Sequence, residues 1–220
     1  MLWNLPYFNP MKSVNEKIKA NEAKWDKRAL SFDEKRFNYF RYMQKKVFSI
    51  IDIHKEINFL DLGCGTGWAV CYVAILLKEK GIFIGIDISQ KMIEKAIKNA
   101  SDLENVKFYK ASSDRLPLQD NFFNVVICTN SFHHYPVPGK VLEETYRVLK
   151  AKGKMYILDV TADDPFIKWI DKMVRRREKE HVRFYSTIDY KNMFLRAGLS
   201  YIKNKQITYP LKIHIAEKKL

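Results

Sequence analysis

The sequence predicts a single α/β domain in which helices cover both faces of a mainly parallel sheet. Three observations support this. From Ile57 onward, short β-like runs alternate with segments of helical periodicity. The runs are apolar almost throughout, which is typical of strands buried on both faces. With 220 residues, 47% of them hydrophobic, the chain can bury one packed core but is too short for two full domains.

The elements are expected in a regular order. Residues 11–54 read as two helices, interpreted as a cap over the mouth of the sheet, with packing on the sheet edge as the alternative. Five β-like runs follow, with helical segments at 68–80, 89–100 and 141–149. The runs are INFLDL (57–62), IFIGID (82–87), VKFYKA (106–111), FNVVICTN (123–130) and KMYILDV (154–160).

Local signals indicate several element ends. Ser89 is an expected N-cap, Pro138 suits the first turn of a helix, and Gly198 suits the position just after one. Two final β-like runs, 200–209 and 211–218, are separated by one proline. Such a short connection joins only antiparallel neighbours, so the sheet is expected to end in a hairpin.

Cysteine usage indicates a reducing compartment. Cys64, Cys71 and Cys128 are odd in number and show no CxxC spacing. We therefore expect buried free thiols, not a disulfide framework or a zinc site, and no metal cluster is expected elsewhere. The sequence shows no signal peptide and no stretch of membrane-spanning length, so a cytoplasmic protein is expected.

The net charge is +14, from 39 Lys and Arg against 25 Asp and Glu. Such an excess is compatible with nucleic acid, an anionic membrane surface or an acidic substrate. The lysines, however, are spread over most of the chain, which is typical of a solvated surface. Only the stretch KMVRRREKEHVR, residues 172–183, is clustered.

The stretch FLDLGCGTGWA, residues 59–69, joins a predicted strand to a predicted helix through Gly63, Gly65 and Gly67. Closely spaced glycines let backbone N–H groups and a helix N-terminus meet a ligand without intervening side chains. The dinucleotide pattern GxGxxG is not met, because the third glycine comes one residue early. A purely structural turn is the alternative interpretation.

Two acids accompany this turn. Asp87 ends the second predicted strand, 24 residues after Gly63, where a carboxylate can accept hydrogen bonds from both hydroxyls of a ribose. Asp61 precedes the first glycine by two residues. Two acids suit a cation better than a pyrophosphate, and S-adenosylmethionine combines a ribose, an amino group and a sulfonium. The alternatives are a helix cap for Asp87 and a structural acceptor for Asp61.

Four stretches together resemble a known family. They are FLDLGCGTG, GIDIS, SSDRLPLQDNFFNVVICTNSFHH and RVLKAKGKMYILDV. In this order, over roughly Trp25 to Gly198, the chain resembles the class I S-adenosylmethionine-dependent methyltransferases. It is most similar to the small-molecule branch that includes the ubiquinone/menaquinone C-methyltransferases. The resemblance implies S-adenosylmethionine as cofactor, with S-adenosylhomocysteine as product, and a small-molecule acceptor.

The resemblance also implies a Rossmann-like three-layer sandwich, with a seven-stranded, mainly parallel sheet whose last strand is antiparallel. This agrees with the terminal hairpin inferred above. We interpret the whole chain, 1–220, as one methyltransferase domain. Its parts are a helical N-terminal cap (1–55), a cofactor-binding core (56–161), a substrate-side insertion (162–186) and a C-terminal helix with hairpin (187–220).

Carried onto matching positions, the resemblance implies a set of cofactor-binding residues. Asp61 would hold the amino end of the methionine moiety and Asp87 the ribose. The acid that usually receives the adenine amine is replaced by Ser112, so Ser113, through its backbone, or Asp114 is expected to take that role. The further residues are Gly63, Gly65 and Gly67 along the methionine moiety, Ile88 and Met92 beside the adenine, and Asn130 with Ser131 near the amino acid part. For Met92, core packing is an equal alternative.

Histidines are the candidates on the acceptor side. His133 and His134, followed by Tyr135, come just after the fourth strand, where open α/β sheets place their ligands. His133 is the predicted general base, although methyl transfer does not require one. In the insertion, His181, Arg183 and Tyr185 are predicted to line the acceptor pocket, with arginine favouring an anionic acceptor. The alternative there is a solvated basic helix with Tyr185 packed beneath it.

Other functions remain open. A nucleic-acid methyltransferase would suit the basic charge, but residues 130–133 read Asn-Ser-Phe-His, not the Asn-Pro-Pro-Tyr type of box that stacks a flipped base. A non-catalytic subunit that binds the cofactor without turnover is a second alternative. A nicotinamide-dependent dehydrogenase is disfavoured by the glycine spacing. The sequence does not indicate the oligomeric state.

Overall fold

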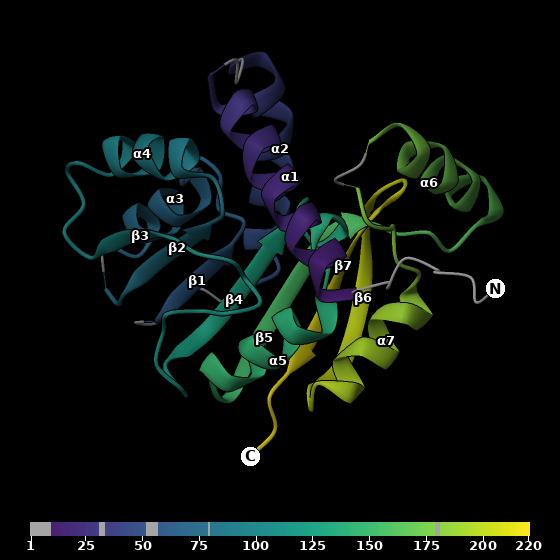
Figure 1. Cartoon of the computed structure of the whole chain (residues 1–220). Coiled ribbons are helices and arrows are strands. Elements are labelled where there is room, and N and C mark those ends of the chain that lie inside the picture. Colours follow the sequence, from purple (N-terminus) through teal and green to yellow (C-terminus); the bar gives the residue numbers. More distant parts are fainter. Residues whose placement is uncertain (1–9, 31–33, 52–56, 79, 179–180) are drawn as a thin grey trace, which may run out of the picture.

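The computed structural model describes residues 10–30, 34–51, 57–78, 80–178 and 181–220 (Figure 1). Within these residues seven strands form one sheet in the order β3-β2-β1-β4-β5-β7-β6. Strands β1 to β5 are parallel, and β7 runs antiparallel to both β5 and β6. This confirms the predicted sheet and its terminal hairpin. The strands are β1 (Phe59–Leu62), β2 (Phe83–Asp87), β3 (Val106–Lys110), β4 (Phe123–Thr129), β5 (Leu149–Val160), β6 (Ser200–Thr208) and β7 (Leu211–Glu217).

Helices cover both faces of the sheet and fill its connections (Figure 1). Buried side chains of α2, α3 and α4 share one core cluster with one face of the strands. Those of α5 and α7 share a second cluster with the opposite face. The helices are α1 (Pro10–Leu30), α2 (Glu34–Phe48), α3 (Trp68–Leu76), α4 (Gln90–Asn99), α5 (Pro138–Val148), α6 (Pro165–Arg177) and α7 (Thr187–Arg196), with a 3-10 turn η1 (Phe132–His134).

The central strands are buried on both sides, as their continuous apolar pattern predicts. In β1 all four residues are buried, with Phe59 in one core cluster and Leu60 and Leu62 in the other. The alternation arises because successive strand side chains point to opposite faces. The three cysteines are buried free thiols, in agreement with the sequence.

Helix ends follow the local signals. The Ser89 hydroxyl accepts a hydrogen bond from the Met92 backbone N–H at 3.1 Å and caps α4. Pro138 is the first residue of α5. Gly198, with φ of 82°, follows the C-cap of α7.

Two boundaries differ from the prediction. The helix expected to reach residue 80 ends at Leu76, because the chain leaves helical geometry at Lys78, where φ is +50°. The helix expected to include Leu149 ends at Val148, and β5 begins at Leu149, five residues earlier than predicted. A register irregularity between β4 and β5 accommodates this early start.

The two N-terminal helices lie over the carboxyl edge of the parallel strands (Figure 1). Phe48 of α2 stacks on Tyr72 of α3, with ring centroids 5.4 Å apart. From α1, Asp26 accepts hydrogen bonds from the Ser89 hydroxyl and the Lys91 backbone at the start of α4. These contacts attach α2 to α3 and α1 to the start of α4. Among the described residues, none of the helices is long and apolar enough to cross a membrane.

Candidate functional site

A glycine turn connects β1 to α3 at the carboxyl edge of the sheet. Gly63, Gly65 and Gly67 have φ of 75°, 54° and 78°, a backbone conformation that other residues rarely adopt. A Cβ added at Gly63 would lie 2.2 Å from Ser131 Oγ, whereas one added at Gly65 would meet nothing within 4 Å. The turn therefore packs closely against the end of β4 at Gly63 and leaves open space at Gly65.

Asp87, the last residue of β2, holds this turn in place. Its Oδ2 accepts a hydrogen bond from the Gly65 backbone N–H at 2.9 Å, and its Oδ1 accepts one from Ser89 at 2.8 Å. Burial raises the pKa of Asp87 above its ordinary value, although these backbone donors oppose the rise. The carboxylate also borders the cavity described below. Its position thus combines support of the turn with access to a ligand.

Asp61 is the unusual residue of the site. It lies on β1 with no exposed surface, and neither carboxylate oxygen has a hydrogen-bond partner among the described residues. Burial, together with the nearby charge of Asp87, raises the pKa of Asp61 to about 8. An unpartnered buried carboxyl group is costly, so a cationic ligand above the turn would suit it.

This raised pKa predicts how stability depends on pH. The folded chain keeps the Asp61 proton up to about pH 8, whereas the unfolded chain loses it near 3.8. The contribution of Asp61 is therefore fully present below pH 3.8 and is lost as the pH rises through about 8. Asp61→Asn should gain stability relative to the wild type by up to about 1.4 kcal/mol per pH unit in this window.

Urea unfolding of both proteins at pH 5.5 and 8 measures this effect. Subtracting the wild-type free energy of unfolding from that of the variant at each pH removes the contributions of the other titrating groups. A difference that stays constant between the two pH values would contradict the raised pKa of Asp61.

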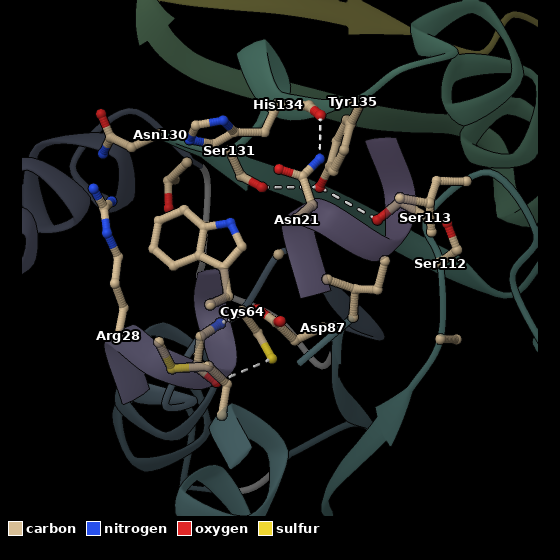
Figure 2. Close-up of a pocket in the computed structure, with 18 of the residues that line it drawn as sticks. Asn21, Arg28, Cys64, Asp87, Ser112, Ser113, Asn130, Ser131, His134 and Tyr135 are labelled. Atoms are coloured by element: carbon tan, nitrogen blue, oxygen red, sulfur yellow. Dashed lines mark hydrogen bonds between the residues drawn. The ribbon is translucent and has the colours of Figure 1, made fainter. Parts of the chain in front are cut away.

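A cavity of about 430 Å³ opens beside the glycine turn, within the size range of small-molecule sites. Figure 2 shows Asp87 and Cys64 on one side and Ser131, His134 and Tyr135 on another. Its walls come from the ends of β1, β2 and β4 and from both N-terminal helices. The predicted site residues on its lining are Gly63, Gly65, Asp87, Ile88, Met92, Ser113, Asn130, Ser131 and His134.

Tyr135 organises the wall at the end of β4. Its hydroxyl oxygen lies 3.1 Å from Ser131 Oγ and 3.3 Å from Ser113 Oγ (Figure 2). Burial raises the pKa of Tyr135 well above its ordinary value, so the phenol stays neutral. The tyrosine joins the turn after β4 to the loop after β3. The sequence offered it beside His133 and His134 as a candidate base, and its part in linking these two loops was not predicted.

The remaining predicted residues lie outside the lining of this cavity. Asp114 accepts a hydrogen bond from the hydroxyl of Ser112, which itself lines the cavity. Arg183 is exposed and pairs with Asp189 at 3.0 Å. Tyr185 is buried against Phe132 in the core. The others are Asp61, Gly67, His133 and His181.

Residues 53–211, which is more than half of the chain, match the family described as methyltransferase domain. The chain belongs to the class I S-adenosylmethionine-dependent methyltransferases. It is 29% identical over 161 residues to YcgJ, an uncharacterized methyltransferase of Bacillus subtilis (strain 168). The matched segment covers 71% of this chain and 62% of YcgJ. It is 30% identical over 166 residues to the ubiquinone/menaquinone biosynthesis C-methyltransferase UbiE of Wigglesworthia glossinidia brevipalpis, covering 74% and 62%.

The methyltransferase chain thus spans about three fifths of the length of these two relatives. Among solved structures, it matches a SAM dependent methyltransferase from Aquifex aeolicus with a TM-score of 0.67. That match has 23% sequence identity and covers 96% of this chain and 99% of the other. The seven-stranded architecture is therefore that of a known methyltransferase fold.

The residues present fit S-adenosylmethionine, the cofactor of this family. Asp87 offers a carboxylate on the cavity wall at the end of β2. The space in front of Gly65 leaves the turn open to a ligand. The unpartnered carboxyl group of Asp61 beneath the turn suits the positive charge of the methionine end. Each observation matches a different chemical part of the cofactor.

The N-terminal helices supply lining residues of the methyltransferase that sequence reasoning missed. Asn21 donates a hydrogen bond to the His134 carbonyl at 2.8 Å, and Gln44 donates one to the Thr129 hydroxyl at 2.9 Å. One signal was present in the sequence, because the four lining positions of α1 recur at helical spacing along one face. These are Ile18, Asn21, Trp25 and Arg28.

Proposed function

We propose that this methyltransferase transfers the methyl group of S-adenosylmethionine to a small-molecule acceptor bound beneath α1. One observation carries the proposal. A single cavity extends from Asp87 and the glycine turn to the side chains of Trp25 and Arg28 on α1. A cofactor at the first end leaves the second end for an acceptor.

The cofactor half of the cavity assigns roles to this chain's residues. Asp87 would hold the ribose hydroxyls, and the open backbone at Gly65 would border the methionine moiety. Ile88 and Met92 would pack beside the adenine, and Ser112 and Ser113 border the same region. When bound, S-adenosylmethionine supplies a methyl carbon on a positively charged sulfur that is already a good leaving group.

The protein's task is then to orient the acceptor and to exclude water. Positioning of two reactants can contribute roughly 7 to 11 kcal/mol to lowering a barrier. Tyr135 is half-buried and bonded to Ser113 and Ser131, which gives the cavity a rigid wall. Trp25 and Ile18 of α1 would cover the acceptor from the other side. No general base is required of this arrangement.

The acceptor end favours a planar aromatic molecule. The Trp25 ring packs edge-on to the His134 ring with centroids 5.4 Å apart, and the Arg28 guanidinium lies 5.1 Å from the Trp25 centroid. Aromatic walls suit an aromatic ring, and an exposed arginine at the rim suits an anionic substituent. The similarity to C-methyltransferases of ubiquinone/menaquinone biosynthesis supports the same class. We propose a quinone precursor or a related phenol.

Incubation with S-adenosylmethionine labelled in its methyl group tests the proposal. The acceptor panel contains prenylated hydroquinones, carboxylated phenols, arsenite and transfer RNA, with the label traced by mass spectrometry. Label on a phenol or hydroquinone is the expected result. Label on RNA alone would favour the nucleic-acid alternative, and cofactor binding without any transfer would favour a non-catalytic subunit.

Trp25→Ala sharpens this test. Loss of the aromatic wall should raise KM for the acceptor by roughly tenfold, the equivalent of about 1.4 kcal/mol of lost packing. Cofactor affinity should change little. The matched control is Trp169→Ala, because Trp169 is 57% exposed on α6 and lies outside the cavity lining. Equal KM values for the two variants would contradict the proposed acceptor position.

A further inference from the structure

Three histidine side chains converge between the turn after β4 and the segment after α6. His133 and His134 belong to η1, and His181 lies 47 residues further along the chain than His134. Each offers one ring nitrogen, and these three nitrogens lie within 4.8 Å of one another. His134 and His181 are buried, and the side chain of His133 is only 14% exposed. Ring nitrogens removed from solvent to this extent normally have hydrogen-bond partners or a ligand.

Buried carboxylates hold two of these rings. Asp159 Oδ1 lies 2.7 Å from His133 Nδ1, and Asp171 Oδ1 lies 2.7 Å from His181 Nε2. A carboxylate accepts the ring N–H, so the lone pair is assigned to Nε2 of His133 and to Nδ1 of His181. Metal-binding histidines show this same arrangement, in which an outer carboxylate fixes the tautomer and orientation of the ring.

The backbone keeps the three residues in register. The Val182 N–H donates to the His133 carbonyl at 3.0 Å, which joins the two segments. The Phe184 N–H donates to Asp171 Oδ1 at 2.7 Å, and Asn21 holds the His134 carbonyl. The cluster is therefore supported from η1, α1 and α6. Such support is expected for a site built to receive a ligand.

We propose that His133, His134 and His181 bind one divalent transition-metal ion of the zinc class. Neutral imidazoles suit zinc, copper or nickel, whereas Mg²⁺ and Ca²⁺ require oxygen ligands. Zn–N bonds of about 2.0–2.1 Å in tetrahedral geometry place the nitrogens about 3.3 Å apart. The nitrogens now lie within 4.8 Å of one another, so each separation needs to close by no more than about 1.5 Å. Three protein ligands leave the fourth position of the ion for water.

The ion would connect the cavity wall at His134 to the segment after α6 that contains His181. His134 lines the cavity, whereas His133 and His181 do not. A bound metal would tie η1 to the segment after α6 and thereby fix the wall that His134 contributes. The site uses side chains that the proposed binding of S-adenosylmethionine does not use.

Titration of the untagged, chelator-stripped full chain with zinc chloride tests the proposal without any methylation assay. Calorimetry should give one saturable equivalent. X-ray absorption at the zinc edge of the loaded wild type should then show nitrogen neighbours at about 2.0–2.1 Å and no sulfur. No saturable binding, or sulfur neighbours that indicate the cysteine thiols, would overturn the proposal.

His181→Gln removes the metal-binding nitrogen and keeps a side-chain N–H for Asp171. It should weaken zinc binding by more than about 100-fold, and Asp171→Asn by about 10- to 100-fold. The matched control is His214→Gln, because His214 is a buried histidine bonded to Thr161 and Tyr201 outside the cluster. If His181→Gln fails to fold, the absorption spectrum of the wild type decides. Equal affinities of folded His181→Gln and the control would refute the assignment.

Discussion

Replacing Asp87 with alanine is expected to weaken S-adenosylmethionine binding by roughly two orders of magnitude. The change removes a carboxylate from the cavity wall and frees the Gly65 and Ser89 N–H groups that it holds. A hydrogen bond to a charged group contributes about 1.5–3 kcal/mol, and a ribose offers two hydroxyls. The loss of about 3 kcal/mol therefore corresponds to roughly a 150-fold increase in Kd, measured by calorimetric titration.

Two further variants separate binding from folding. Asp102→Ala changes the net charge equally at an exposed residue beyond the end of α4, so its Kd should match the wild type. Asp87→Asn keeps an oxygen that can accept from Gly65, so its Kd should fall between those of the wild type and Asp87→Ala. An unchanged affinity in folded Asp87→Ala would remove this residue from the cofactor site.

The fold was predictable because each of its main features has a local cause. Continuous apolar runs such as residues 82–87 mark strands buried on both faces, and the one-proline connection fixes the final hairpin. Element ends were less accurate. Nothing in the sequence around Lys78 signals its positive φ, and the early start of β5 at Leu149 depends on pairing with β4. Such boundaries are set by tertiary contacts, which override local preference.

The two halves of the candidate site also differ in how far the sequence predicts them. The cofactor half is formed at the ends of β1 and β2, which are neighbours in the sheet. Motifs around Gly63 and Asp87, at the ends of these two strands, were therefore enough to predict that the two residues lie close together. The acceptor half depends on where α1 lies. The Asn21 contact with His134 spans 113 residues, and no local signal encodes it.

The histidine cluster was missed for a similar reason. Sequence reasoning treated His133 and His181 as separate candidates, one catalytic and one on the acceptor side. They meet because Asp159 and Asp171 each orient one ring, and because backbone hydrogen bonds join their segments. The spacing of the histidines along the chain does not reveal a site of this kind, because the carboxylates that orient them lie on β5 and α6.

Gly81→Ala, at the amino edge of the sheet, is expected to destabilise the fold strongly. Gly81 precedes β2 with φ of +126°, and an added Cβ would lie 1.9 Å from the backbone carbonyl oxygen of Ile57. Because both atoms are fixed to backbone, no side-chain rotation relieves the overlap. Backbone strain of about 1–3 kcal/mol and overpacking of about 1–3 kcal/mol combine to roughly 4 kcal/mol, or a Tm lower by about 10 °C.

The control is Gly139→Ala in α5, where an added Cβ meets nothing within 4 Å and φ is not positive. Alanine there should leave stability unchanged or raise it by up to about 1 kcal/mol, because it restricts the unfolded chain. Urea unfolding followed by circular dichroism compares the two variants, and equal midpoints would contradict the expected clash. Gly81 lies at the end of the sheet opposite the cavity, so folded Gly81→Ala should still bind S-adenosylmethionine with the wild-type Kd. Asp87→Ala should show the reverse, a folded protein with weakened affinity for S-adenosylmethionine. The two variants therefore distinguish a residue needed for the stability of the sheet from one needed for cofactor binding.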